Sequence, residues 1–305
     1  MRRPTAPNPR PVAVLAVLLG GFLFAGAANG QDEVPGDSRA SPSRPATLRT
    51  TPAQRLAAVD TTTLDNKTRL KVTASLARWQ ALPSPPTGRW LLVNIPAFEI
   101  SLYDGQERTG TWRAIVGKPK TPTPRFAGSV TGVILNPWWD VPKSIVAESV
   151  GRMVARDPTR AAAQGYVREG ERYRQRPGPH NQLGLMKLDF RNPYSIGIHD
   201  TPSRQLFEKE KRAFSHGCIR VDDPFAFAAA LLGEPTSRDS LNTLRETNPD
   251  TQRLPLTEPL PVIVGYFTAE VQEDGTLRLF DDVYRLDRNK EGALASASFA
   301  DECSG

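Results

Sequence analysis

Short runs of alternating hydrophobic and polar residues fill most of the chain from residue 89 to residue 287. Two of these runs, residues 90–103 and 111–116, flank Asp104-Gly105, a pair that favours a tight hairpin turn. Many short strands separated by Gly and Asp turns are typical of a mainly β domain, which we expect over residues 89–287. The other strand-like runs are residues 132–135, the pair 185–190 and 194–199, and the pair 262–268 and 276–280.

Two longer segments have a helical pattern instead. Residues 53–82 place Leu, Val and Trp side chains loosely on one face, which predicts a short helical segment over residues 53–86. Residues 144–176 are polar and also predict helix, and residues 224–232 predict a short apolar helix. The first segment is ended by Pro83, Pro85 and Pro86.

The second helical segment is rich in basic side chains. Residues 143–176 contain eight Lys or Arg and four Asp or Glu, an excess of four positive charges. Such an excess fits either a basic lid that attracts carboxylates or an ordinary solvated helix face. The whole chain carries a formal charge of +6, and three of these charges are arginines near its start, so the charge does not indicate nucleic acid as a partner.

The N-terminus has the pattern of a secretory signal peptide. Residues 1–28 begin with arginines, continue with a small and apolar stretch, and end with small residues at positions 25–27. The alternative is an uncleaved membrane anchor, and no later apolar run reaches the length of a membrane span. Residues 29–52 are rich in Pro, Ser, Arg and Thr, so we expect a disordered linker there and a flexible tail over residues 288–305.

The rarest reactive side chains lie close together in residues 198–224. This stretch contains two of the three histidines, His199 and His216, and one of the two cysteines, Cys218. A thiolate is a strong nucleophile, and a neighbouring base or positive charge can lower the thiol pKa enough to form it. Gly217 leaves room for backbone amides to approach a developing oxyanion. The alternative is a buried free cysteine near a core histidine.

The order of these residues resembles a known catalytic motif. His199 is followed by fifteen residues and then by Ser-His-Gly-Cys-Ile-Arg at positions 215–220. This resembles the L,D-transpeptidase (YkuD-type) catalytic domain, whose pattern is His, a spacer, and then Ser/Thr-His-Gly-Cys-x-Asn/Arg. The resemblance implies a β-sandwich-like domain over residues 89–287, with a helical lid insertion at about 144–176 as in the larger periplasmic members. It also implies export across the inner membrane to the periplasm.

The resemblance implies a catalytic role for one cysteine and one histidine. Cys218 would be the nucleophile and His199 the proton donor and acceptor. His216 lies two residues from Cys218 in a tight turn, where the two side chains can point apart, whereas His199 ends a strand that can lie beside that turn. We expect the amides of Gly217 and Cys218, with that of His216, to stabilise the oxyanion.

Three neighbouring polar residues have supporting roles in this interpretation. Asp200 would orient the imidazole through its side chain or its backbone carbonyl. Arg220 would hold a substrate carboxylate, or else tie the turn that contains Asp222 and Asp223. Ser215 is expected to bond the turn rather than to react, because sulfur is the stronger nucleophile.

The remaining candidates stand apart from this motif. Trp138 and Trp139 either line a substrate groove or cover the edges of the core. His180, in a loop, is interpreted as a surface or substrate-facing residue. Cys303 lies in a small, polar tail, and we expect it not to pair with Cys218, because a disulfide would remove the nucleophile. We expect no metal site and no cofactor.

The activity that the resemblance implies is peptidoglycan L,D-transpeptidation in cell-wall biogenesis. Stem peptides would be cross-linked through a cysteine acyl-enzyme, and β-lactams of the carbapenem type would be covalent inhibitors. The alternatives are an L,D-carboxypeptidase that hydrolyses the same bond, or attachment of peptidoglycan to an outer-membrane protein. A papain-like protease has its Cys before its His, which is the opposite order.

Overall fold

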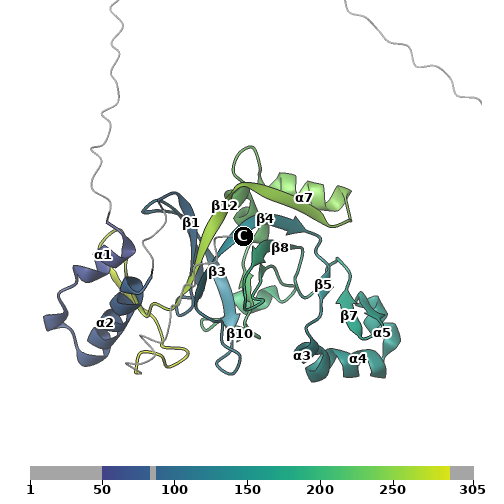
Figure 1. The fold of residues 1–305 in the computed structure, drawn as a ribbon, viewed down its shortest axis with the longest axis horizontal. Helices are drawn as coiled ribbons and strands as arrows, with labels where there is room; N and C mark the ends of the chain where they lie inside the picture. The colour runs from purple at the N-terminus through teal and green to yellow at the C-terminus, as the bar shows by residue number, and fades with distance from the viewer. Residues whose placement is uncertain (1–49, 83–86, 289–305) are drawn as a thin grey trace, which may run out of the picture. The chain divides into compact units, whose positions relative to one another are not determined.

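The computed structural model describes residues 50–82 and 87–288 (Figure 1). The predicted signal peptide at 1–28, most of the predicted linker and Cys303 lie outside the described residues. Within the described ranges, no helix is long and apolar enough to cross a membrane.

A large β-sheet is the main element of the described residues, which confirms the prediction of a mainly β domain. Its strand order is β10-β3-β11-β9-β8-β4-β12-β1-β2, and because β2 also pairs with β3, the sheet closes on itself. Figure 1 labels most of these strands in the central part of the ribbon. The strands are β1 (Arg89–Asn94), β2 (Glu99–Asp104), β3 (Glu107–Gly117), β4 (Phe126–Leu135), β8 (Met186–Arg191), β9 (Ile198–His199), β10 (Ala213–Ser215), β11 (Ile219–Val221) and β12 (Gln252–Gly265).

Two hydrophobic cores lie on opposite faces of strand β1. Leu91 and Val93 belong to the main core of the closed sheet, whereas Trp90 and Leu92 belong to a second core. Successive side chains of a strand point to opposite faces, so burial of both faces accounts for the near-continuous hydrophobic run in β1. The main core also receives one face of α6 (Pro224–Leu232), the apolar helix predicted at these residues.

The second core joins the N-terminal helices to the sheet. It is built around α1 (Pro52–Ala57) and α2 (Asn66–Gln80), with a short 3-10 helix η1 (Thr61–Thr63) between them. The Trp79 ring stacks on Phe267 with centroids 4.1 Å apart. The Ser75 hydroxyl accepts a hydrogen bond from the Ala269 N–H at 3.0 Å. The helical segment is therefore packed on the large sheet and is not a separate unit.

Most of the predicted strand runs are present, with changes at their ends. The β2–β3 hairpin turns at Gly105, which has φ +56°, as the Asp-Gly pair predicts. The run 90–103 is divided into β1 and β2 by a turn at Phe98, whose φ is +55°. The hairpin predicted between 262–268 and 276–280 is wrong in its first strand, because β12 continues to Gly265 and a new strand follows. That hairpin is formed by β13 (Ala269–Val271) and β14 (Leu277–Leu279).

The insertion predicted to be helical over residues 144–176 is helical only in its first half. Helices cover Lys143 to Ala163, and a three-stranded sheet in the order β5-β7-β6 follows. Gly165 and Gly170 have φ +85° and +63°, values that end a helix and turn a hairpin. The elements are β5 (Trp139–Asp140), α3 (Lys143–Ile145), the π-helical turn η2 (Val146–Val150), α4 (Gly151–Arg156), α5 (Pro158–Ala163), β6 (Tyr166–Glu169) and β7 (Arg172–Gln175).

Two further helices complete the described fold. The sequence analysis did not predict α7 (Arg238–Thr247), a polar helix with a single buried residue, Leu241. Its first turn is closed by Ser237, whose hydroxyl accepts the Ser240 N–H at 3.1 Å. The 3-10 helix η3 (Arg204–Glu208) lies between β9 and β10.

A buried ion pair ties α2 to the end of the described chain, and it yields a stability prediction. The Arg78 guanidinium donates to Asp287 at 2.7 Å, with side chains 4% and 3% exposed. Asp287→Asn leaves a buried guanidinium without its counter-charge, which should lower the free energy of unfolding by about 3–5 kcal/mol. Denaturant titration measures this change.

The matched control for this prediction is an exposed ion pair. Lys211 and Asp281 lie 2.8 Å apart with side chains 72% and 64% exposed. Asp281→Asn should change the free energy of unfolding by no more than about 1 kcal/mol. Equal effects of the Asp287 and Asp281 substitutions would contradict the importance assigned to the buried pair.

Candidate active site

A tight turn between β10 and β11 presents the thiol. Gly217 has φ +118°, a conformation that side chains other than glycine rarely adopt. The Ser215 hydroxyl accepts a hydrogen bond from the Gly217 N–H at 3.1 Å and donates one to the Cys218 carbonyl at 2.5 Å. Ser215 therefore spans the turn and fixes both of its sides.

This bonding separates the three amides that the sequence indicates for an oxyanion hole, those of His216, Gly217 and Cys218. The Gly217 N–H is already bound to Ser215, so it does not point freely toward a substrate. The Cys218 N–H forms no hydrogen bond with any residue that the structure describes. Among the described residues the His216 N–H has no partner either, so the amides of Cys218 and His216 are left as donors for an oxyanion, whereas that of Gly217 is bonded to Ser215.

Cys218 is half-buried, and its sulfur lies against Gly197, two residues before His199. The Gly197 N–H donates to Sγ at 3.3 Å. Burial raises the pKa of the Cys218 thiol, while this hydrogen bond and the charge of Arg220 act in the opposite direction. The net direction is upward, so a reaction that used Cys218 as a nucleophile would have to remove the thiol proton.

His199 reaches the same place because β9 and β11 pair in parallel. That register sets His199 opposite Arg220 and Ile198 opposite Ile219. A Cβ built on Gly197 would lie 3.5 Å from His199 Cδ2 and 3.9 Å from Cys218 Sγ, so ring and sulfur border one small volume. No hydrogen bond joins them among residues 50–82 and 87–288.

The environment of His199 keeps its ring neutral. The ring is buried, and burial, followed by the positive charge of Arg220, lowers the pKa of His199 to about 4. Its Nδ1 lies 2.5 Å from the Asp200 carbonyl oxygen. A carbonyl can only accept, so Nδ1 donates to Asp200, and the Leu183 carbonyl is a second backbone acceptor beside the ring. The imidazole is thus in the form that accepts a proton.

Asp200 contributes to the site through its backbone, while its carboxylate has other partners. One carboxylate oxygen accepts from the Thr201 N–H at 2.6 Å and from Arg204 at 2.7 Å. The other accepts from the Leu185 N–H at 2.8 Å. Of the two routes by which Asp200 could orient the imidazole, the structure shows the backbone carbonyl. The carboxylate instead anchors the segment that returns from the insertion.

Arg220 is a half-buried cation whose guanidinium has no bonded partner in the described chain. Its Nε is inaccessible to solvent and has no hydrogen-bond partner. The alternative role in the adjoining turn is not observed, because Asp222 binds Arg113 at 2.6 Å and Asp223 binds Arg238 at 3.2 Å. Arg220 is two residues from the thiol and is available for an anion.

His216 points toward the insertion and is exposed. Its Nε2 lies 3.1 Å from a Glu148 carboxylate oxygen and 3.2 Å from Lys118 Nζ. Glu148 belongs to η2 of the insertion, so this segment contacts the residue two positions before Cys218. The His216 ring therefore contacts Glu148 and Lys118 and not the Cys218 sulfur.

The sequence analysis did not predict the loop at residues 121–124, which bonds to the turn between β10 and β11. The Thr121 hydroxyl donates to the Ser215 carbonyl at 3.2 Å, and the Thr123 hydroxyl donates to the Gly217 carbonyl at 2.7 Å. Both belong to the Thr-Pro-Thr-Pro stretch at 121–124, a loop between β3 and β4. This stretch is the sequence feature that could have indicated these hydrogen bonds to the turn. Gly197 was missed too, and nothing in its own sequence context distinguishes it.

The two tryptophans and His180 belong to the insertion and its return loop. Trp138 lies under the Arg174 guanidinium, 4.5 Å from its ring centroid. Trp139 packs edge-to-face on Tyr166 at 6.5 Å. Both tryptophans are half-buried at the base of the three-stranded sheet. His180 is exposed, and its carbonyl accepts from the Gln175 side chain.

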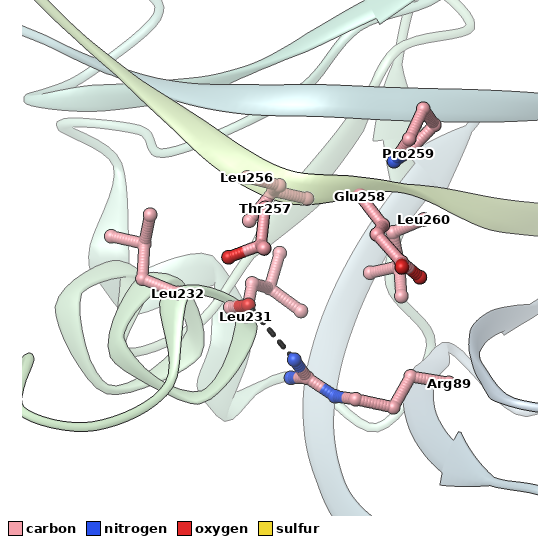
Figure 2. A pocket seen from close by; sticks show the side chains of 8 residues that line it. All are labelled: Arg89, Leu231, Leu232, Leu256, Thr257, Glu258, Pro259 and Leu260. Carbon is pink, nitrogen blue, oxygen red and sulfur yellow. Dashed lines mark hydrogen bonds between the residues drawn. The ribbon is translucent and has the colours of Figure 1, made fainter.

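A surface hollow lies elsewhere in the fold. It measures about 190 Å³ and is lined by the end of α6 and by the irregular part of β12. Figure 2 shows Arg89 pointing toward Leu231, whose carbonyl it binds. No residue of the turn between β10 and β11 lines this hollow, so the hollow is distinct from the site around Cys218. Within the described ranges, no group of three or more His, Cys, Asp or Glu is arranged to hold a metal ion.

Comparison with known proteins gives the relatives of this chain. A protein of Haemophilus influenzae that is provisionally named an L,D-transpeptidase is 27% identical over 239 residues, covering 72% of this chain and 48% of the relative. The chain thus spans about half the length of this curated relative.

Solved structures with lower similarity include two L,D-transpeptidases. One, from Mycobacterium smegmatis, has 15% identity and a TM-score of 0.32, with 58% of each chain covered. The other is the catalytic domain from E. faecium acylated by ertapenem, with 14% identity, a TM-score of 0.34, and coverage of 60% of this chain and 100% of that one. At these TM-scores the two structures add nothing to the family assignment.

The assignment rests on the match to a protein family. The family model of the YkuD L,D-transpeptidase catalytic domain matches residues 88–264, more than half of the chain. The match includes the closed sheet from β1 to β12 and both His199 and Cys218. The chain therefore belongs to the YkuD L,D-transpeptidase catalytic domain family.

Proposed function

We propose that this chain is a peptidoglycan L,D-transpeptidase that works through a Cys218 acyl-enzyme. The observation that carries the proposal is the shared volume at Gly197, where the Cys218 thiol and the neutral His199 ring meet. An unbonded Cys218 N–H lies in the same turn, and these three groups are what acyl transfer to sulfur requires. Family membership supports the reaction class.

The first half of the reaction forms the thioester. Cys218 Sγ attacks the amide carbonyl between the third residue of a stem peptide and its terminal D-Ala, while the neutral His199 ring takes the thiol proton. The carbonyl oxygen becomes an oxyanion, which the Cys218 N–H stabilises. The C–N bond then breaks, and His199 returns the proton to the departing D-Ala amine.

The second half transfers the acyl group. A side-chain amine of a neighbouring stem attacks the thioester carbonyl and loses a proton to His199. The C–S bond breaks, the new amide cross-links the two stems, and His199 reprotonates Cys218. If water attacks in place of the amine, the product is a shortened stem and the enzyme is an L,D-carboxypeptidase.

Arg220 suits the recognition of the donor. The terminal D-Ala of a tetrapeptide stem carries a free carboxylate, and an unpaired guanidinium binds carboxylates in a bidentate manner. Arg220 follows the nucleophile by two residues, so a carboxylate bound there lies beside the scissile bond. We place this activity in the periplasm, on the basis of the signal-peptide pattern in the sequence.

The direct test uses tetrapeptide muropeptides and purified enzyme, with the products weighed by mass spectrometry. Cross-linked dimers that have lost one D-Ala are expected. Tripeptides alone would favour the carboxypeptidase, and unchanged substrate would count against both. Addition of a purified outer-membrane protein to the same reaction tests the third alternative, in which the acceptor is a protein amine.

Carbapenems should acylate one residue of the chain. The expected result is a mass increase of one inhibitor molecule, mapped to the peptide that contains Cys218. Cys218→Ala should lose both the adduct and all turnover, since the nucleophile is absent. Cys303→Ser should keep both. An adduct that persists in Cys218→Ala would contradict the assignment of the nucleophile.

The pH dependence of acylation should report the buried His199. Since its pKa is lowered to about 4, the ring is neutral at every pH above that value and can accept the thiol proton. The rate of carbapenem acylation should therefore hold as pH falls from 7 to 5 and decline only near 4. An acid limb centred near 6.5, the ordinary histidine value, would contradict this assignment.

Arg220 should affect donor recognition more strongly than thiol chemistry. Arg220→Gln should reduce kcat/KM for a tetrapeptide donor about 10- to 100-fold, which corresponds to loss of one charge-assisted carboxylate contact. A donor whose terminal carboxylate is amidated lacks that contact, so the wild type and Arg220→Gln should use it about equally. Equal losses with both donors would contradict carboxylate binding.

A further inference from the structure

The peptide group between Gly217 and Cys218 is held from its carbonyl side. The Thr123 hydroxyl donates to the Gly217 carbonyl at 2.7 Å. The N–H of that same planar peptide group is the Cys218 amide, and in a trans peptide the carbonyl and the N–H point in opposite directions. A bond that fixes the Gly217 oxygen therefore fixes the direction of the Cys218 N–H.

Thr123 is held in turn by two groups. Its hydroxyl oxygen accepts from the Gly117 N–H at 2.9 Å, so its one proton is committed to Gly217. Its own N–H donates to the Tyr284 hydroxyl at 3.2 Å, and that hydroxyl donates to the Gly117 carbonyl at 2.6 Å. Thr123 is only 2% exposed, so water does not compete strongly for these bonds.

Tyr284 comes from a segment beyond the matched family region, which ends at residue 264. Its N–H donates to the Tyr266 hydroxyl at 2.8 Å, and Tyr266 donates to Asp282 at 2.7 Å. The rings of the two tyrosines also stack with centroids 5.6 Å apart. The segment at 281–287 thus has internal bonds that hold the Tyr284 hydroxyl in place.

We propose that Thr123 and Tyr284 are positioning residues that aim the Cys218 N–H at the oxyanion. Neither touches the substrate in this account; they act through the Gly217–Cys218 peptide group. The donation by Thr123 also polarises that peptide, which strengthens its N–H as a donor. The inference rests on the proposed function, because it assumes that Cys218 attacks a carbonyl.

Two reactions of the same thiol separate positioning from general damage. Acylation by a carbapenem creates an oxyanion at the lactam carbonyl, whereas alkylation by iodoacetamide displaces iodide at a saturated carbon and creates none. Thr123→Val keeps the shape of the side chain and removes the hydroxyl. It should slow acylation about 10- to 100-fold, which is less than the slowing expected when an oxyanion donor is removed altogether. It should change the rate of alkylation less than twofold.

Three variants complete the experiment. Thr123→Ser restores a hydroxyl and should return the acylation rate to within about threefold of the wild type, as expected when the hydroxyl carries the effect. Tyr284→Phe keeps the ring and should slow acylation selectively, by a smaller factor than Thr123→Val. Thr131→Val makes the same substitution on β4, where the hydroxyl lies 3.1 Å from Asp189, and should leave both rates unchanged.

The outcomes decide between the two proposals. Equal slowing of acylation and alkylation in Thr123→Val and Tyr284→Phe would overturn the inference, because it would show a general disturbance of the turn. Unchanged acylation in both variants would overturn it too. Absence of any adduct on the wild-type chain would overturn the proposed function itself, and the inference with it.

Discussion

The hydroxyl of Ser215 is the interaction on which the site depends most. It accepts from Gly217 and donates to the Cys218 carbonyl, and so closes a turn that only glycine readily enters, at φ +118°. The turn is short because β10 and β11 both pair with β3, which brings Ser215 and Ile219 close together. These constraints leave the Cys218 N–H without a partner and hold the sulfur beside the strand of His199.

Burial determines the charge state of Cys218 and His199, the proposed catalytic pair. It raises the pKa of the Cys218 thiol and lowers that of His199, so the resting site holds a thiol and a neutral imidazole. The positive charge of Arg220 favours the Cys218 thiolate and the neutral His199 ring, so it lowers the pKa of both groups. In the proposed reaction, proton transfer from Cys218 to His199 would therefore accompany the attack of the sulfur.

The sequence predicts local features of this fold better than those set by distant contacts. The Asp104-Gly105 turn and the helix at 224–232 were predictable because turn chemistry and a compact apolar run decide them locally. The hairpin at 166–175 was not, since its many charged side chains have no strand alternation and its turns depend on glycines at positive φ. Within the site, the thiol and imidazole are indicated by rare residues in a motif. The roles of Thr123 and Tyr284 are not, because 161 residues separate them and only the fold joins them.

The central claim is that Cys218 carries the acyl group between donor and acceptor. The most direct measurement is the mass of the enzyme after a brief incubation with a tetrapeptide donor and no acceptor amine, followed by quenching in acid. The account predicts an increase equal to the donor minus D-Ala, located by digestion on the peptide containing Cys218. Release of D-Ala with the adduct on another residue would contradict it.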